Sequence, residues 1–153
     1  MLVKYTTNTL KYICFILVIL TFSFPANSEL SVEEIIKGRK ALFSKNYNTA
    51  KRVQTFASKG DFEKAKSLML EMSQNYKILI DYFPENTKEG FKTEALPIIW
   101  EDKENFNNLM TKASTDMAQL TKIIESSDDI RGTLGKFMWS NCKACHSKYR
   151  EEH

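Results

Sequence analysis

The chain has 153 residues, of which 27% are charged and 42% are hydrophobic, and its formal net charge is +3. This length allows one domain with a single hydrophobic core. Two of the 22 basic residues lie within the first 28 positions and all 19 acidic residues lie beyond them, so the rest of the chain has a net charge of +1. A balance this close to neutral gives no support to nucleic-acid binding, and we expect no nucleic-acid partner.

The N-terminus has the pattern of a secretory signal peptide. Lys4 and Lys11 precede an apolar run over residues 12–24, and small residues follow up to Ser28. The run has 13 residues, which is short for a membrane-spanning helix, although an uncleaved anchor is the alternative interpretation. We predict cleavage after Ser28 and export to the periplasm.

This pattern divides the chain into a signal peptide, residues 1–28, and one domain, residues 29–153. Cys14 lies inside the apolar run, and we expect it to be removed with the signal peptide. The domain then holds two cysteines, Cys142 and Cys145, so no disulfide framework can form without them.

Two helices are predicted in the first half of the domain. Ser31 with Glu34 has the spacing of a capping box at the start of the first helix, which we expect to stop at Gly60. Asp61 is the predicted N-cap of the second helix, and Pro84 ends it. Apolar residues recur at heptad-like spacing in both helices, which predicts a buried seam. The predicted core positions are Ile36, Phe43, Tyr47, Ala50, Val53 and Ala57, followed by Phe62, Ala65, Met69, Met72, Tyr76, Leu79 and Phe83.

Two more helices are predicted in the second half. The third begins near Ile98 and carries a broad apolar stripe. We expect the segment 126–128 to break it and to supply the next N-cap, with the fourth helix running from about Asp129 to Tyr149. Gly132 and Gly135 weaken this fourth helix, and close approach of a neighbour is one explanation for them. The predicted core positions are Ile99, Phe106, Met110, Ala113, Met117, Leu120 and Ile124 in the third helix, and Leu134, Met138, Cys142, Cys145 and Tyr149 in the fourth.

The order of the elements predicts an all-α fold. The chain has no hairpin turn signal and no sustained alternation of apolar and polar residues. Four amphipathic helices with two short connections and one longer one favour an antiparallel four-helix bundle.

A single C-x-x-C-H motif, Cys142-Lys143-Ala144-Cys145-His146, lies near the C-terminus and has the spacing that attaches haem c. On a helix, side chains at i, i+3 and i+4 share one face, so two thiols and one imidazole point the same way. A redox dithiol would favour a strand before the helix, and a zinc site would need two further ligands. We predict one haem c, covalently attached through Cys142 and Cys145, with His146 as the axial iron ligand.

Three parts of the domain together suggest a family. They are the block 142–150, the block 96–100 (Leu-Pro-Ile-Ile-Trp), and Arg39 with Phe43 in the first helix. On these residues the chain resembles cytochrome c′, the class II c-type cytochromes, over essentially all of residues 29–153. Class I cytochromes c differ, because their motif lies near the N-terminus and a methionine ligand follows it.

The resemblance implies where the haem would sit and what would surround it. The haem would lie between the helices near one end of the bundle, with His146 as proximal ligand. Arg150 would lie beside the proximal imidazole, and Arg39 would reach a haem propionate. The alternative for either arginine is an ordinary surface charge.

The sixth iron position distinguishes two kinds of relative. In low-spin members of the family a methionine from the first helix fills it, but this first helix has no methionine, and Phe43 stands where the family puts its distal residue. Because a phenyl ring cannot ligate iron, we predict a five-coordinate iron and an apolar distal pocket without a hydrogen-bond donor. A six-coordinate protein would instead point to Met69, Met72 or Met117.

Three functional hypotheses follow. The first is a haem c protein that binds NO or CO, and the second is a dedicated one-electron carrier in a respiratory chain with no gas-binding role. The third is an enzyme or a haem-free bundle, which is the least supported because His146 is already used and the only other histidine is the terminal His153. We therefore expect no enzymatic activity, and we expect redox partner proteins. Relatives often form a homodimer through their first two helices, and the sequence leaves both a monomer and a homodimer open.

Overall fold

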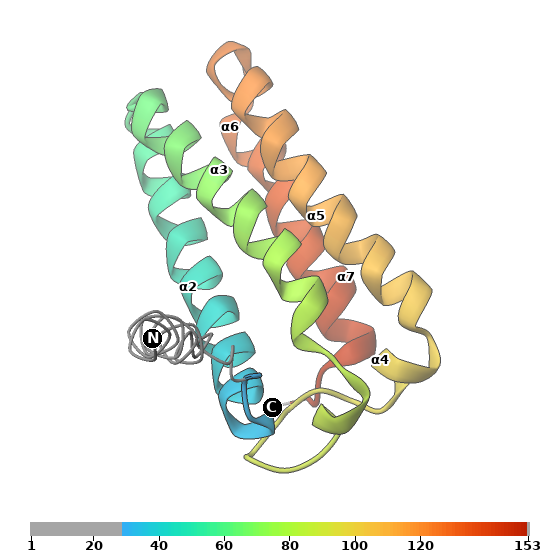
Figure 1. The fold of residues 1–153 in the computed structure, drawn as a ribbon. Helices are drawn as coiled ribbons and strands as arrows, with labels where there is room; N and C mark the ends of the chain where they lie inside the picture. Colours follow the sequence, from blue (N-terminus) through green and yellow to red (C-terminus); the bar gives the residue numbers. More distant parts are fainter. Residues whose placement is uncertain (1–28, 153) are drawn as a thin grey trace, which may run out of the picture.

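Four long helical segments alternate in direction and pack side by side as an antiparallel bundle (Figure 1). The computed structural model describes residues 29–152. The long segments are α2 (Val32–Ser58), α3 (Phe62–Leu79), α5 (Lys103–Ile123), and the last segment made of α6 (Ile130–Leu134), the π-helical turn η5 (Gly135–Trp139) and α7 (Ser140–Tyr149). Short helices occupy the connections: η2 (Ile80–Tyr82), η3 (Glu85–Thr87), α4 (Ile98–Glu101) and η4 (Ile124–Ser126). The predicted all-α four-helix bundle is confirmed.

The starts of the first two helices are capped as their sequences predict. The Ser31 hydroxyl accepts from the Glu34 backbone N–H at 3.3 Å, while the Glu34 carboxylate accepts from the Ser31 backbone N–H at 2.8 Å. This reciprocal pair satisfies two of the free N–H groups at a helix start. Asp61 caps α3 in the same way, by accepting from the Lys64 backbone N–H at 3.4 Å. Between the two helices Gly60 has a φ of 76°, which favours glycine.

The last helical segment starts differently from the prediction. Its N-cap is Asp129, which accepts from the Gly132 backbone N–H at 2.9 Å, so the assignment of the cap to residues 126–128 is wrong. A Cβ on Gly132 would lie 2.2 Å from the Asp129 Oδ2, which explains the glycine. Gly135 has no such neighbour within 4 Å in the described chain, so close approach does not explain it.

The predicted third helix is two helices. Asp102, with φ −115° and ψ 39°, separates α4 from α5. Its carboxylate accepts from the Tyr149 hydroxyl at 2.7 Å and from Asn105 at 2.6 Å, and it forms an ion pair with Lys148. Asp102 therefore links the start of α5 to the C-terminal turn of α7, a contact between residues 47 positions apart.

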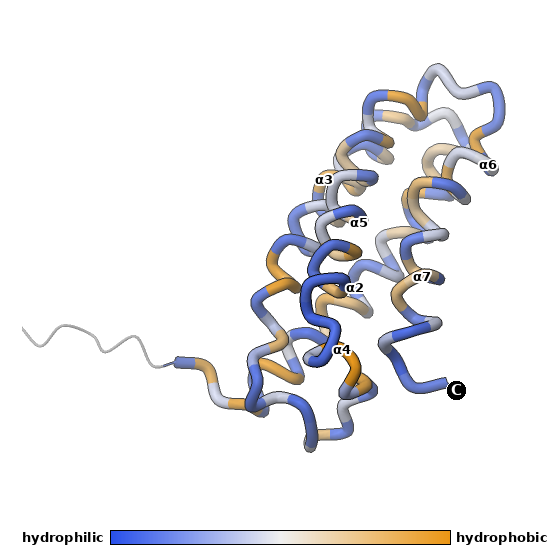
Figure 2. Tube along the Cα trace, turned by 90° about the vertical axis from the view of Figure 1, so that its right-hand side faces the viewer, coloured by the Kyte–Doolittle hydropathy of each residue, from blue (hydrophilic) through white to orange (hydrophobic). Residues whose placement is uncertain are grey.

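The core follows the predicted seams with one exception. Along the tube in Figure 2, hydrophobic and hydrophilic residues alternate as expected for helices with one buried face. The predicted core positions of α5 are buried, and so are Leu134, Met138 and Tyr149. Phe43, Phe62, Cys142 and Cys145 are half-buried at the edge of this core. Tyr47 is the one exposed exception, at 56%, and its ring makes an edge contact with the Trp139 ring.

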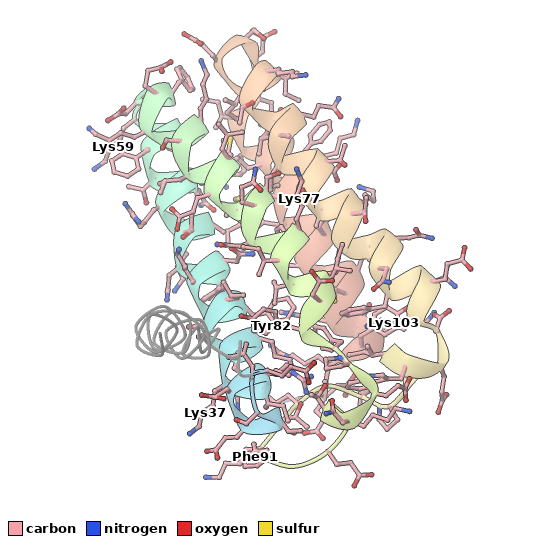
Figure 3. The ribbon with its side chains drawn as sticks, viewed as in Figure 1. Lys37, Lys59, Lys77, Tyr82, Phe91 and Lys103 are labelled. Atoms are coloured by element: carbon pink, nitrogen blue, oxygen red, sulfur yellow. The ribbon has the colours of Figure 1, made fainter. Side chains whose placement is uncertain are left out.

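Charged side chains cover the outside of the bundle. Lys37, Lys59 and Lys77 are exposed (Figure 3). Lys37 pairs with Glu33 at 2.6 Å, one turn earlier on α2. Such exposed pairs contribute little to stability. Within the described residues, no helix is both long and apolar enough to cross a membrane.

The contacts between helices leave one side of the bundle less closed than the others. Helix α2 packs on α3, α3 on α5, and α5 on η5 and α7. The ring is completed at one end, where α6 contacts α2. Towards the other end, a cavity lies between α2 and α7. The C-x-x-C-H motif is on α7 at that end.

The Asp102 link generates a prediction about pH. Bonds from Lys148, Tyr149 and Asn105 lower the pKa of Asp102 from 3.8 to about 2. A carboxyl whose pKa is depressed by folding stabilises the folded state above its unfolded pKa and stops doing so as the pH falls through its folded pKa. Asp102→Asn should therefore lower the free energy of unfolding at pH 7. The difference from the unsubstituted chain should shrink as the pH falls from about 4 towards about 2.

Urea unfolding of both proteins across this pH range measures the difference. Glu104→Gln, an exposed acidic position in the same first turn of α5, is the control and should show no such pH-dependent difference. A destabilisation by Asp102→Asn that is the same at every pH would contradict the assignment.

Candidate cofactor site

One cavity of about 760 Å³ collects the residues that the sequence singled out. It is lined by residues of α2, α3, α5 and α7 and by the loop around residues 93–95, and its volume is typical of a site for a small organic molecule or cofactor. The predicted site residues that line it are Arg39, Phe43, Cys142, Cys145, His146 and Arg150. Residues more than a hundred positions apart therefore share one site.

The two thiols lie at the α7 wall, partly buried, and unpaired with each other. Burial raises the pKa of Cys145 to about 12 and also raises the pKa of Cys142. The Cys142 Sγ donates to the Met138 carbonyl oxygen at 3.7 Å. At neutral pH both side chains are therefore neutral thiols.

His146 follows Cys145 on the same helix face. Burial lowers its pKa, and the nearby Arg150 charge lowers it further, whereas Glu94 acts in the opposite direction. A lower pKa favours the neutral imidazole, which is the form that ligates metal ions.

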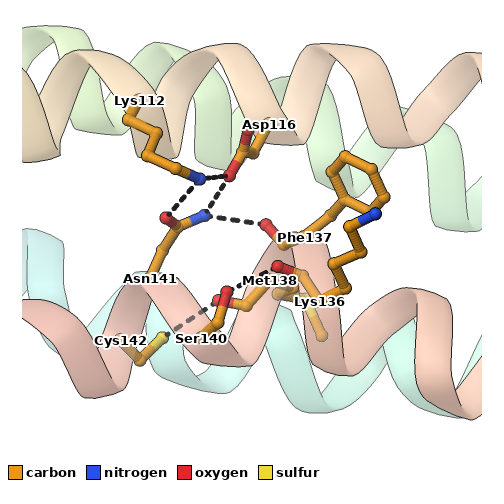
Figure 4. A network of polar contacts seen from close by, with 8 residues as sticks. All are labelled: Lys112, Asp116, Lys136, Phe137, Met138, Ser140, Asn141 and Cys142. Carbon is orange, nitrogen blue, oxygen red and sulfur yellow. Dashed lines mark hydrogen bonds and ion pairs between the residues drawn. The ribbon is translucent and has the colours of Figure 1, made fainter.

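A π-helical turn directly precedes the motif. The Ser140 backbone N–H donates to the Gly135 carbonyl, five residues back instead of four. The side chains of Ser140, Asn141 and Cys142 then donate to the carbonyls of Lys136, Phe137 and Met138, respectively (Figure 4). These three bonds satisfy carbonyl groups beside the irregular turn. π-Helical turns are often found at functional sites.

Asn141, the residue before the motif, fixes α7 to α5. Its Nδ2 donates to the Asp116 carboxylate at 2.8 Å and to the Phe137 carbonyl at 2.8 Å (Figure 4). Asp116 also pairs with Lys112, and both Asn141 and Asp116 are 8% exposed. This buried network sets the position of the turn that carries Cys142. The sequence does not predict it, because no local spacing relates residues 25 positions apart.

Arg39 is almost fully buried at another part of the cavity wall. Its two terminal nitrogens donate to the Thr87 hydroxyl and carbonyl at 2.9 Å each and to the Thr93 hydroxyl at 2.6 Å. Its guanidinium lies 4.6 Å from the Phe83 ring centroid and 5.7 Å from that of Trp100. Burial lowers the pKa of Arg39 to about 10, so the side chain stays charged at neutral pH. Among the described residues it forms no ion pair.

Aromatic side chains form another part of the wall. Phe43 reaches the cavity from α2 and makes an edge contact with Phe83, with 6.4 Å between ring centroids. Phe83 contacts Phe106 at 4.7 Å, and Phe106 contacts Tyr149 at 5.3 Å. Phe43 and His146 therefore line the same cavity from two different helices.

The cavity also contains polar side chains that the sequence analysis missed. Asn46, 3% exposed, and Tyr76, 6% exposed, both line it. Asn46 lies three residues after Phe43 and shares its helix face, which was the signal available in the sequence. The cavity as a whole therefore contains hydrogen-bond donors, whereas the sequence predicts none in the distal pocket.

The methionines are also arranged differently from the expectation. Met69, Met72 and Met117 are buried in the bundle core but do not line the cavity. The methionine that does line it, within the described residues, is Met110 on α5, which is 2% exposed.

Arg150 ends α7 in extended conformation, with φ −126° and ψ 145°. It pairs with Ala95 in an isolated antiparallel bridge, beside a bond from the Leu96 backbone N–H to the Tyr149 carbonyl at 3.1 Å. The Arg150 Nε is buried without a hydrogen-bond partner among the described residues. The C-terminal end of α7 is thus bonded to the loop that contains Thr93 and Ala95, to which Arg39 of α2 also donates.

The bonds of Arg39 predict a large effect of its removal on stability. Arg39→Met keeps the length of the side chain but leaves buried oxygens of Thr87 without a donor, which should lower the free energy of unfolding by on the order of 3 kcal/mol. Arg39→Lys should lower the free energy of unfolding by less than Arg39→Met does, because an ammonium group keeps the charge but lacks the planar fork of N–H donors.

Chemical unfolding of the variants measures this effect, and Arg52→Met is the matched control. Arg52 is exposed on the same helix, so its substitution should change the free energy of unfolding by no more than about 0.5 kcal/mol. Equal effects of the two substitutions would contradict the role of Arg39.

Comparison with known proteins identifies the family. Residues 34–150 match the family model described as Cytochrome C′. A cytochrome c′ from Rhodopseudomonas palustris is 28% identical over 120 residues, covering 76% of this chain and 82% of the relative. A cytochrome c-556 from Agrobacterium tumefaciens is 29% identical over 90 residues, covering 59% of this chain and 70% of the relative.

Solved structures agree with this match. The cytochrome c′ structure from Rubrivivax gelatinosus superposes with a TM-score of 0.66 at 26% identity, and covers 78% of this chain and 97% of its own. A cytochrome c′ structure from Rhodopseudomonas palustris gives a TM-score of 0.64 at 26% identity, with coverages of 77% and 96%. By its sequence match over residues 34–150 and by its fold, this chain belongs to the cytochrome c′ family and is a haem c protein.

Proposed function

We propose that the chain holds one haem c in the cavity between α2 and α7, with thioether bonds to Cys142 and Cys145 and with His146 as an axial ligand. We further propose that the coordination position on the Phe43 side is open and that it binds a small neutral molecule such as NO or CO. The observation that carries the proposal is that Phe43, which has no metal-binding atom, lines the cavity from α2, while His146 lines it from α7.

The residues that line the cavity fit haem c. The two thiols and the imidazole come from little more than one turn of α7, so a flat macrocycle can be attached and ligated from a single helix face. The aromatic rings of Phe43, Phe83 and Phe106 suit the apolar faces of such a group. The buried cation of Arg39, which has no ion-pair partner among the described residues, suits a carboxylate at the edge.

The side chains around this site have distinct tasks in the proposal. His146 provides a neutral nitrogen ligand, and the π-helical turn and Asn141 hold its helix in place. Phe43 covers the other side and limits access to it, so that a ligand enters only when the ring moves. Bound haem c supplies an iron that can change its ligands and its oxidation state.

Arg150 and Arg39 set the electrostatics of the site. The charge of Arg150 partly offsets the rise that burial causes in the pKa of Cys145, and it adds to the lowering of the His146 pKa by burial. Arg39 keeps its charge inside the wall, and a propionate would accept from the Thr93 hydroxyl beside it. Two positive charges near the haem would favour the reduced iron, which binds CO.

A dedicated one-electron carrier is the second candidate function, and Met110 is the observation that favours it. Met110 is buried in the cavity wall and carries a thioether sulfur, which is an iron ligand in cytochromes c. If Met110 reached the iron, the sixth position would be closed. The first candidate is preferred because Phe43, and no methionine, occupies the corresponding face of α2.

The setting of this function also belongs to the proposal. The predicted signal peptide lies outside the described residues, and export to the periplasm rests on its sequence pattern. There we expect redox partner proteins, small diatomic ligands, and no enzymatic reaction. Self-association through α2 and α3 is consistent with the exposed Tyr47 and Leu70 on those helices.

Replacement of Phe43 tests the open position. Phe43→Ala removes the ring that a ligand must displace, so CO association with the reduced protein should become faster on the order of tenfold, which corresponds to about 1.4 kcal/mol of barrier. Flash photolysis of the CO complex measures this rate. Phe56→Ala is the matched control, because Phe56 lies partly buried on the same helix but does not line the cavity. An unchanged rate in Phe43→Ala would refute the position assigned to Phe43.

A further inference from the structure

Helix α2 presents three different chemical groups to the cavity in a regular series. Arg39, Phe43 and Asn46 are at positions i, i+4 and i+7, which share one face of a helix, and all three line the cavity. At a rise of about 1.5 Å per residue, Asn46 lies about 4.5 Å further along the helix axis than Phe43. The amide therefore neighbours the ring that covers the proposed open position.

The orientation of the Asn46 amide is fixed by α3. The Asn75 Nδ2 donates to the Asn46 Oδ1 at 2.8 Å. Asn46 and Asn75 are 3% and 6% exposed, so this bond is protected from water. Because Asn75 occupies the oxygen end of the amide, the nitrogen end of Asn46 is left for another acceptor.

That nitrogen has no hydrogen bond of accepted geometry among the described residues, although the Tyr76 hydroxyl is close enough to interact with the Asn46 side chain. The Asn46 Nδ2 is buried and makes no hydrogen bond. Buried polar atoms of this kind are rare, because leaving a donor unsatisfied in a protein interior is destabilising. An amide whose oxygen is anchored and whose nitrogen is unsatisfied in a cavity wall is a preformed hydrogen-bond donor.

Tyr76 provides a second polar group, a hydroxyl, in the same cavity. It is 6% exposed, and it is close enough to the Cys142 thiol and to Asn46 for both to affect its pKa, which is raised chiefly by burial. Tyr76 therefore lies near both Cys142 and Asn46, and its hydroxyl is the competing partner for the Asn46 amide.

We propose that the Asn46 Nδ2 donates a hydrogen bond to the oxygen atom of a small ligand bound on the Phe43 side of the cavity. This inference rests on the proposed function and adds a specificity-determining residue to it. The donor should favour ligands whose outer atom is an oxygen with partial negative charge, and should disfavour ligands with an apolar outer end. The pocket would then combine steric exclusion by Phe43 with polar selection by Asn46.

Infrared spectroscopy of the CO complex tests the hydrogen bond directly. A donor at the oxygen end weakens the C–O bond, so Asn46→Leu should shift the C–O stretching band to higher wavenumber. The same substitution should speed CO dissociation by roughly twofold to tenfold, as expected for the loss of one neutral hydrogen bond. Asn48→Leu, an exposed position on the same helix, is the control and should leave band and rate unchanged.

Two further variants keep the test decisive. Asn75→Leu frees the amide to rotate without changing Asn46, so it should shift the C–O band in the same direction by a smaller amount, even if Asn46→Leu does not fold. Tyr76→Phe should leave the band near its original position. A band that moves in Tyr76→Phe but not in Asn46→Leu or Asn75→Leu would overturn the assignment to Asn46.

The remaining outcomes separate this inference from the proposed function. A CO complex whose band is unchanged in Asn46→Leu and Asn75→Leu would overturn the hydrogen bond and leave the open position intact. Failure of the unsubstituted reduced protein to bind CO would overturn both.

Discussion

The buried Arg39 guanidinium is the interaction on which the site depends. It joins α2 to the loop between α3 and α4 through Thr87 and Thr93, and it stacks on Phe83 and Trp100. The same loop continues through Ala95, which pairs with Arg150 at the end of α7. One cation therefore connects the two helices that face each other across the cavity, at the end where they do not pack directly.

This arrangement explains how a bundle can keep a cavity open. Interiors are normally packed densely, and apolar cavities are destabilising. Here α7 is held by bonds to α5 and to its N-cap, through Asn141 with Asp116 and through Tyr149 with Asp102. The helix therefore does not need contacts across the cavity to keep its position, and the wall residues remain available for a cofactor. The chemistry of α2 then varies along the cavity, from the charge of Arg39 through the ring of Phe43 to the amide of Asn46.

Local signals in the sequence predicted the elements, and long-range contacts account for what they missed. The capping residues Ser31 and Asp61 were predicted because their partners are three residues away. The break at Asp102 was not, because it is stabilised by Tyr149, which is 47 residues away. The bond that fixes Asn141, just before Cys142, likewise comes from Asp116 of another helix. Tyr47 fits the apolar spacing of α2, but it lies at the rim of the cavity against Trp139 and is therefore exposed.

The composition of the site was predictable, but its polarity was not. The C-x-x-C-H motif, Arg39 and Phe43 were recognised from spacing and resemblance, and they line one cavity. Tyr76 occupies a position that the helical pattern assigns to the core, and Asn46 shares a helix face with Phe43, but their place in the cavity wall depends on the packing of the helices.

The central claim is that the iron has His146 on one side and an open position under Phe43 on the other. Electron paramagnetic resonance and absorption spectra of the ferric and ferrous protein, produced in a host that matures haem c, measure the spin state directly. The account predicts a high-spin, five-coordinate iron in the ferrous protein. A six-coordinate, low-spin spectrum that is lost in Met110→Leu would contradict it and would identify Met110 as the sixth ligand.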